Sequence, residues 1–247
     1  MPEQITLYTS ETCPWAQKTR IALAEAKPFG AKWTEFEVDL KNKPDFYAKT
    51  VNPASKVPAI TYGGPAVPPD QPSPESIKIA ESAVLVEFIA DLFPQSNLLP
   101  QDPVLRAKIR FFIDVATTKF VPGWFQFTFK GASPDALYAA AEQVQELLDP
   151  EGPWFAGEQF TIADVSIAPF IERLCVNLQN DVVANPGEGS KVFKELSEAP
   201  RFARFAKYAR AILGRPSVSG TTPHEKLIEG SRVRIATFKQ QAVAAAA

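Results

Sequence analysis

Alternating apolar and polar residues mark the first element of the chain. Ile5 to Thr9 alternate in this way, which predicts a short strand. From Pro14 onward apolar residues recur at helical spacing, so we expect a helix to follow after a tight turn. Pro14 suits the first helical position because its missing N–H would have no partner there. Cys13 is therefore expected at the N-terminus of this helix.

Similar patterns predict the remaining elements of the first half. Residues 33–38 alternate as a second strand, and residues 44–50 fit a short helix. Residues 59–62 and 76–79 predict two further strands, after which a helical pattern runs from Glu81-Ser82 to Phe93-Pro94. Because a strand, a helix and a second strand form a parallel unit, a ligand site is expected at the carboxyl ends of these strands.

The second half carries helical patterns and no clear strand. The polar, proline-bearing stretch 94–103 predicts a boundary between an α/β domain, residues 1–94, and an all-α domain, residues 103–247. We expect helices at 104–119, 134–148, 162–180, around 193–196, at 200–213 and from Pro223 into the alanine-rich tail.

Thr161 and Asp164 have the spacing of a helix capping box. The Thr161 hydroxyl can accept a bond from the Asp164 amide, and the Asp164 carboxylate can accept one from the Thr161 amide. We therefore assign Asp164 to folding and not to catalysis.

Composition and charge narrow the functional classes. The 247 residues include 26 basic and 28 acidic side chains, and a net charge of −2 gives no reason to propose nucleic acid or anionic membrane as a partner. Met1 to Tyr8 lacks the pattern of a secretory signal, and no later stretch predicts a membrane span. Two cysteines and one histidine fit a cytoplasmic protein without a structural metal.

Cys13 has the features of a nucleophile. The amide groups and the positive dipole end of the predicted helix favour the thiolate form. Ala16 occupies the position where a dithiol oxidoreductase carries its second cysteine, and Cys175 lies in an apolar helical stretch where we expect a structural role. A lone reactive thiol needs an external thiol to complete its reaction. The alternative is an inert buried cysteine at a strand-to-helix junction.

Four features occur in a familiar order: a thiol at the first helix start, Lys56-Val57-Pro58 before the third strand, Glu81-Ser82 at a helix start, and a helical second half. This arrangement resembles a cytosolic glutathione transferase. The resemblance implies a thioredoxin-like glutathione-binding domain and a helical domain that contributes the pocket for the second substrate. It also implies that Pro58 follows a cis peptide bond, so that the Val57 backbone pairs with the cysteinyl part of glutathione.

The remaining groups of glutathione can be matched to charged and polar residues. Ser82 and the adjacent helix amides suit the γ-glutamyl carboxylate, and Glu81 can accept from the α-amino group. Lys56 can neutralise the glycyl carboxylate. Each residue also has an ordinary structural interpretation, namely helix capping for Glu81 and Ser82 and a solvated surface charge for Lys56.

Cysteine followed by proline and an aromatic residue is most similar to the omega class of that family. The resemblance implies a thiol transferase that uses glutathione as co-substrate, forms a mixed disulfide on Cys13, and reduces glutathionyl mixed disulfides and dehydroascorbate or deglutathionylates small aromatic compounds. Two other functions stay open. The chain could be a non-catalytic carrier of aromatic compounds or glutathione conjugates, or a structural interaction module.

Aromatic residues between two predicted helices are candidates for the second-substrate pocket. We expect a loop here, and the resemblance implies that this region borders the pocket, with Trp15 as a further contact. The loop residues singled out are Phe120, Trp124, Phe125, Phe127 and Phe129, of which Trp124, Phe125 and Phe127 are the expected ligand contacts. The resemblance also implies a homodimer, and the proline-rich excursion at 65–74 is longer than the usual hairpin.

Overall fold

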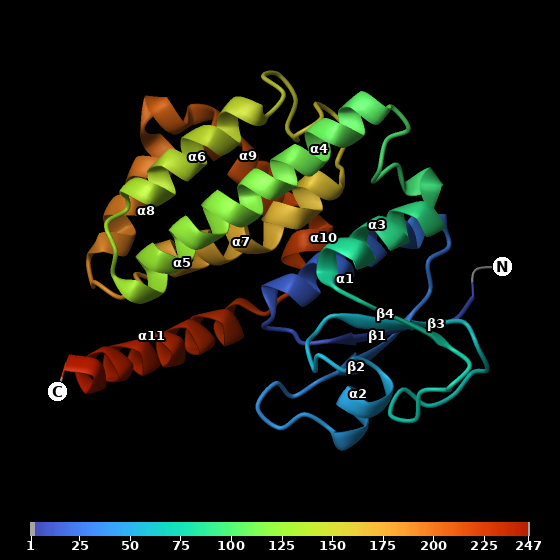
Figure 1. Ribbon diagram of the computed structural model, residues 1–247. Helices are drawn as coiled ribbons and strands as arrows, with labels where there is room; N and C mark the ends of the chain where they lie inside the picture. The colour runs from blue at the N-terminus through green and yellow to red at the C-terminus, as the bar shows by residue number, and fades with distance from the viewer. Residues whose placement is uncertain (1–2, 247) are drawn as a thin grey trace. The chain divides into compact units, whose positions relative to one another are not determined.

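The computed structural model describes residues 3–246 (Figure 1). Met1, Pro2 and Ala247, which the predicted domains include, lie outside the described residues. Contacts along the chain separate two units, with the division between Pro100 and Gln101. Within the described range no helix has both the length and the apolar character needed to cross a bilayer.

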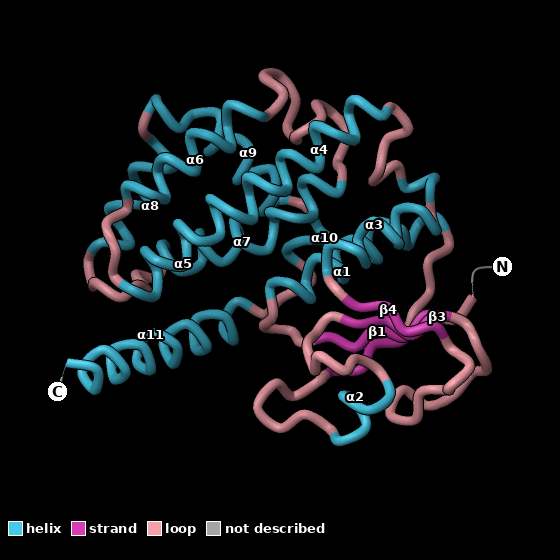
Figure 2. The backbone as a smooth tube through the Cα atoms, in the orientation of Figure 1, coloured by secondary structure: helices cyan, strands magenta, loops and turns pink. Residues whose placement is uncertain are grey.

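A four-stranded mixed sheet forms the centre of the first unit, where all the named strands lie (Figure 2). Its strands are β1 (Ile5–Thr9), β2 (Thr34–Glu37), β3 (Ala59–Tyr62) and β4 (Ile77–Ala80). The spatial order is β2-β1-β3-β4, with β1 parallel to β2 and the other neighbours antiparallel. Every predicted strand is present. The last one starts a residue late because the Ser76 amide and hydroxyl bond back to the Ser73 carbonyl.

Three helices cover this sheet. Helices α1 (Pro14–Ala26) and α3 (Ser82–Leu92) pack against each other on one face, and α2 (Asp45–Thr50) lies on the opposite side (Figure 1). All five β1 side chains are buried between these layers. A mixed sheet of this order with a parallel β1-α1-β2 unit is a thioredoxin-like fold, which confirms the predicted fold class of the first half.

The second unit is helical, as predicted. The longer helices are α4 (Pro103–Val115), α5 (Val121–Lys130), α6 (Asp135–Leu147), α7 (Ile162–Gln179), α8 (Glu188–Glu198), α9 (Ala203–Gly214) and α11 (His224–Ala246), with a short α10 (Pro216–Ser219) between the last two. Helix α7 is buried along almost its whole length and packs against α4, α5, α8, α9 and α11.

The prediction of a loop at residues 120–129 is wrong. A π-helical turn, Ala116–Phe120, continues α4 directly into α5, which contains most of these aromatic residues. Pro122 lies at the start of α5, directly after the π-helical turn, and the continuous helix passes through it. Gly131, with φ +70°, ends the helix in the left-handed conformation that glycine adopts readily.

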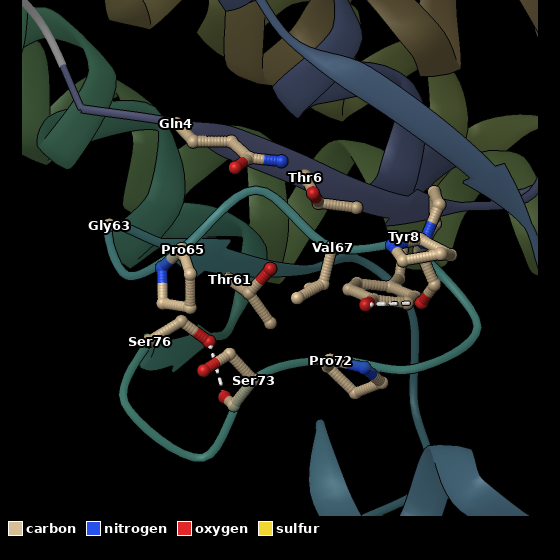
Figure 3. Close-up of a pocket in the computed structure, with 12 residues that line it drawn as sticks. Gln4, Thr6, Tyr8, Thr61, Gly63, Pro65, Val67, Pro72, Ser73 and Ser76 are labelled. Atoms are coloured by element: carbon tan, nitrogen blue, oxygen red, sulfur yellow. Dashed lines mark hydrogen bonds between the residues drawn. The ribbon is translucent and has the colours of Figure 1, made fainter.

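The proline-rich excursion folds back over the sheet (Figure 3). The Tyr8 hydroxyl donates a 2.7 Å hydrogen bond to the Pro69 carbonyl, and Lys78 Nζ donates to the carbonyls of Ser73 and Ser76. A cavity of about 10 Å³ lies beneath the loop, with Thr6 and Thr61 among its polar lining. This is about the room that one water molecule needs. The excursion is therefore an ordered part of the first unit.

The predicted capping box at Thr161 is confirmed. Thr161 Oγ1 accepts from the Ala163 amide, and the Asp164 carboxylate accepts from the Thr161 and Phe155 amides at 2.8 and 2.9 Å. The Tyr208 hydroxyl donates a further bond of 2.8 Å to the same carboxylate. Burial raises the pKa of Asp164, although these donors oppose the shift. Asp164 thus ties α7 to α9 inside the second unit.

Candidate active site

The register of the sheet brings three separate chain segments to one edge of the first unit. The residues that pair in a single row across β1, β3 and β4 are Tyr8, Ala59 and Ala80. Just beyond this row, β1 leads into the turn that ends at Cys13, the Val57-Pro58 peptide precedes β3, and β4 leads into Glu81. Residues far apart in sequence are therefore neighbours at this edge.

Cys13 is the N-cap residue of α1, as predicted. Its amide donates to the Ser10 carbonyl at 3.0 Å, which closes the turn, and Pro14 occupies the first helical position. The half-buried Cys13 side chain packs against a buried cluster that includes Tyr8 and Tyr47. Its Sγ lies 4.0 Å from the Val57 carbonyl oxygen. The thiol thus lies at the helix N-terminus and directly beside the Val57 backbone.

The segment before β3 is held by hydrogen bonds to its backbone. The Lys56 carbonyl accepts from the Tyr47 hydroxyl at 2.6 Å and from Asn52 Nδ2 at 2.8 Å. The Val57-Pro58 peptide is cis, as the resemblance implied. Among the residues that the structure describes, none accepts from the Val57 amide. A buried residue with an unpaired backbone donor, fixed beside a thiol, can bind the backbone of a peptide ligand.

Glu81 and Ser82 begin α3 at the same edge. Glu81 has φ +74°, a conformation that is uncommon outside glycine, and its side chain is exposed. Ser82 is buried, and its hydroxyl has no hydrogen-bond partner within residues 3–246. A free hydroxyl and first-turn amides suit a carboxylate, while the Glu81 carboxylate suits an amine. Lys56 is exposed, so its ammonium group is available to a ligand.

Tyr47 and Asn52 are site residues that the sequence analysis missed as such. Burial raises the pKa of Tyr47 well above its ordinary value, which keeps the hydroxyl protonated as a donor to Lys56. The sequence predicted only the short helix at residues 44–50 in which Tyr47 lies. Its hydrogen bond depends on a carbonyl nine residues away, and nothing in the local pattern identifies that partner.

Trp15 and Lys18 form a pair on α1. The Lys18 ammonium lies 4.4 Å from the centre of the Trp15 ring, within the range of a cation–π interaction. Burial lowers the pKa of Lys18 to about 8. Trp15 is 36% exposed, which leaves part of its ring accessible two residues after Cys13.

The other aromatic candidates lie on α5 in the second unit. Trp124 and Phe127 are buried, and Trp124 packs edge-on against Phe129 and Phe170. Phe125 is half-buried and contacts Phe129 and Phe238. Most of this aromatic surface is therefore used in the core of the second unit, and Phe125 keeps the largest accessible fraction of the three.

Comparison with known proteins agrees with this geometry. The profile described as "Glutathione S-transferase, N-terminal domain" matches residues 12–92, and that of "Glutathione S-transferase, C-terminal domain" matches residues 132–210. The crystal structure of glutathione transferase Omega 1C from Trametes versicolor is 52% identical, has a TM-score of 0.90, and is covered over 98% of its length by 96% of this chain. The chain belongs to the glutathione S-transferase family.

Two further relatives extend the comparison of this transferase. Glutathione transferase Omega 2S from Trametes versicolor, solved in complex with 2,4-dihydroxybenzophenone, is 37% identical, has a TM-score of 0.83, and is covered over 96% of its chain by 93% of this one. Glutathione S-transferase L1 from Arabidopsis thaliana is 30% identical over 70% of this chain and 67% of its own. The transferase is thus omega-like, and its activity depends on glutathione.

Proposed function

We propose that this transferase is a glutathione-dependent thiol transferase that acts through a mixed disulfide on Cys13. The observation that carries the proposal is the position of Cys13 Sγ at the N-terminus of α1, 4.0 Å from the Val57 carbonyl. A hydroxyl in that place could only stabilise the thiolate of bound glutathione, whereas a thiol can form a mixed disulfide with glutathione. Ala16 cannot resolve the adduct, so a second glutathione must do so.

The proposed reaction has two exchange steps. The Cys13 thiolate attacks the glutathionyl sulfur of a mixed disulfide, forms a Cys13–glutathione disulfide and releases the other half as a thiolate that takes a proton from water. A glutathione thiolate then attacks the bound glutathionyl sulfur and releases the Cys13 thiolate with oxidised glutathione. The net exchange converts the mixed disulfide and one glutathione into a free thiol and oxidised glutathione, so that one S–S bond breaks, one forms, and the incoming glutathione is the reductant.

The residues around Cys13 fit the parts of glutathione, which we propose as follows. The Val57 backbone pairs with the cysteinyl residue, and the cis Pro58 fixes its direction. The first-turn amides of α3 and the Ser82 hydroxyl bind the γ-glutamyl carboxylate, and Glu81 accepts from its amino group. Lys56 pairs with the glycyl carboxylate. The unpaired Val57 amide and Ser82 hydroxyl support this assignment.

Small aromatic or electrophilic compounds are the second substrates that we propose. The partly accessible ring of Trp15, two residues from Cys13, and the relative solved with 2,4-dihydroxybenzophenone support this class. Trp124, Phe125 and Phe127 stay candidates, with Phe125 the most accessible. Those two observations also favour a second function, non-catalytic carriage of aromatic compounds.

One experiment separates the two functions. Turnover of a small glutathione mixed disulfide, reduction of dehydroascorbate and conjugation of an aryl halide are measured for the native protein, Cys13→Ser and Cys175→Ser. We expect the first two activities to fall at least about a hundredfold in Cys13→Ser, because the exchange has no other nucleophile, and to persist in Cys175→Ser. A Cys13→Ser variant that keeps most of its disulfide reductase activity would exclude the proposed mechanism. Aromatic binding without turnover in the native protein would select the carrier.

We also propose that the protein is a cytoplasmic homodimer. Its two free cysteines fit a reducing compartment, where glutathione is available. The apolar side chains of Ile77 and Val84, at the β4 edge and on α3, are 60% and 53% exposed, which is typical of a surface that another protein covers. Light scattering of the native protein and Val84→Asp tests the dimer. A native monomer would refute it.

A further inference from the structure

The turn that carries Cys13 is held by a carboxylate from the neighbouring strand. Glu37 is the last residue of β2, and both of its carboxylate oxygens accept from the Glu11 amide, at 3.0 and 3.2 Å. Glu11 lies inside the turn that is closed by the hydrogen bond from the Cys13 amide to the Ser10 carbonyl. Glu37 therefore contacts the backbone that leads to the thiol, although it is 26 positions away from Glu11 in the chain.

The backbone position of Glu37 is fixed by the sheet. Glu37 pairs with Thr9 in the parallel register of β1 and β2, and the amide of the next residue, Val38, donates to the Thr9 carbonyl at 2.8 Å. The Val38 side chain is fully buried in the cluster against which Cys13 packs. The carboxylate of Glu37 is therefore presented to the turn from a rigid strand end, and a hydrogen bond to a charged acceptor is stronger than one between neutral groups.

The negative charge of Glu37 is not paired with a cation. Among the residues that the structure describes, its carboxylate has the Glu11 amide as its only hydrogen-bond partner and forms no salt bridge. Two residues earlier on the same strand, the Glu35 carboxylate accepts from Trp33 Nε1 at 2.8 Å and lies 3.4 Å from Arg20 Nε. One carboxylate of β2 is thus neutralised by an arginine, and the one at the thiol turn keeps its full charge.

We propose that Glu37 positions the Cys13 turn for thiol exchange and, through its charge, disfavours the approach of anionic reactants to the thiol. The first role rests on the proposed function of Cys13, whereas the second concerns any reagent that meets the sulfur. Glu37 acts through the turn, so it is a positioning residue. Its charge lies within one tight turn of Cys13, a separation of about 10 Å, and is little screened at low ionic strength. A neutral reactant should not respond to this charge.

Full-length variants with and without an oxygen acceptor test the positioning role. Glu37→Gln keeps an oxygen that can accept from the Glu11 amide, and Glu37→Ala removes it. With a small glutathione mixed disulfide as substrate, we expect Glu37→Ala to lower kcat/KM about fivefold, mainly through kcat, and Glu37→Gln to keep at least about half of the native value. The matched control is Glu35→Gln on the same strand, which should change kcat/KM less than about twofold. Native kcat/KM in Glu37→Ala would overturn the positioning role.

Alkylation of Cys13 tests the effect of the charge without glutathione. The rates with neutral iodoacetamide and with anionic iodoacetate are read by mass spectrometry of the Cys13 peptide. At low salt we expect the ratio of the iodoacetate rate to the iodoacetamide rate to rise about twofold in both Glu37→Gln and Glu37→Ala, and to stay at the native value in Glu35→Gln. In about 1 M salt the four proteins should have the same ratio, because the charge is then screened. An unchanged ratio in Glu37→Gln at low salt would overturn the electrostatic role, even where the loss of activity in Cys13→Ser upholds the thiol mechanism.

Discussion

The hydroxyl of Tyr47 lies 2.6 Å from the carbonyl oxygen of Lys56, the residue that precedes Val57 and the cis proline. The bond connects α2 to the backbone segment beside the thiol. Asn52 supports the same carbonyl from the loop that follows α2. The position of the Val57 amide therefore depends on a helix that supplies no proposed ligand contact of its own.

Tyr47→Phe removes one of these two donors. We expect the free energy of unfolding to fall by about 1 kcal/mol, the usual contribution of a buried neutral hydrogen bond. The KM for glutathione should rise several-fold while kcat changes less, because the segment that binds the peptide loses a support and the thiol does not. Tyr62→Phe is the control, since the Tyr62 hydroxyl has no hydrogen-bond partner among the described residues. Identical KM values in the two variants would show that Tyr47 has no positioning role.

Glu81 offers a prediction in which stability and binding change in opposite directions. Its φ of +74° is costly for any residue with a Cβ, so Glu81→Gly should be about 1 kcal/mol more stable than Glu81→Ala. Both variants lose the carboxylate proposed for the glutathione amino group and should bind glutathione about tenfold more weakly. Denaturant unfolding and calorimetric titration measure the two quantities. Unchanged glutathione affinity in both variants would remove Glu81 from the proposed site.

The two cysteines should differ in reactivity although both are half-buried. Burial of its sulfur, with Glu172 nearby, raises the pKa of Cys175 to about 12, so that its thiolate is present in only about one molecule in 10⁵ near pH 7. We expect iodoacetamide to modify Cys13 alone in the folded protein and both residues after unfolding, as read by mass spectrometry of peptides. Modification of Cys175 at the rate of Cys13 would contradict this expectation.

Lys18 should give stability a dependence on alkaline pH. Its pKa is about 8 in the folded protein, against about 10.4 in an unfolded chain. Between these values the unfolded state binds more protons, so the free energy of unfolding rises with pH, and below pH 8 the cost of burying the charge is fully present. The expected gain from pH 8 to about 10.4 is at most about 3 kcal/mol. Lys18→Met should lack this increment, and parallel pH profiles of the two proteins would refute the shift.

Asp164 should be among the most important side chains for stability in the second unit. Its carboxylate accepts bonds from the Phe155 and Thr161 amides and from Tyr208, all in buried surroundings. Asp164→Ala leaves these donors unpaired and should lower the free energy of unfolding by about 3 kcal/mol or more. The exposed N-cap variant Asp102→Ala should cost only about 1 kcal/mol. Equal denaturation midpoints would contradict the assignment.

Local sequence signals predicted the parts of the fold that depend on local physics. Alternation in β1 and the position of Pro14 identified the first strand, the helix start and the place of Cys13. The same reasoning missed α5. Its nearly continuous aromatic run has no clear 3.6-residue period, and Pro122-Gly123 has the sequence of a helix break. A π-helical turn, which no residue pattern announces, joins it to α4.

Long-range contacts account for the rest of what the sequence did not reveal. Lysine is usually a solvent-exposed residue, yet Lys18 is buried, because its burial is decided by the packing of residues that are distant in sequence. The Tyr47 bond and the Tyr8 bond to Pro69 likewise join positions that no spacing rule relates. The order of Cys13, Val57-Pro58 and Glu81-Ser82 along the chain suggested a common site, but only the strand register shows that they share an edge.

The single row formed by Tyr8, Ala59 and Ala80 ties the thiol environment to one alignment of the strands. A shift of β3 by one residue would move the Val57 backbone about 3.3 Å along the strand and turn the buried Ile60 to the opposite face. Partly ordered forms of the first unit with a shifted strand would thus lose the Val57 backbone contact beside Cys13 while keeping their secondary structure. During refolding, the fraction of Cys13 that glutathione protects against alkylation should consequently report the fraction of molecules that have the native strand register.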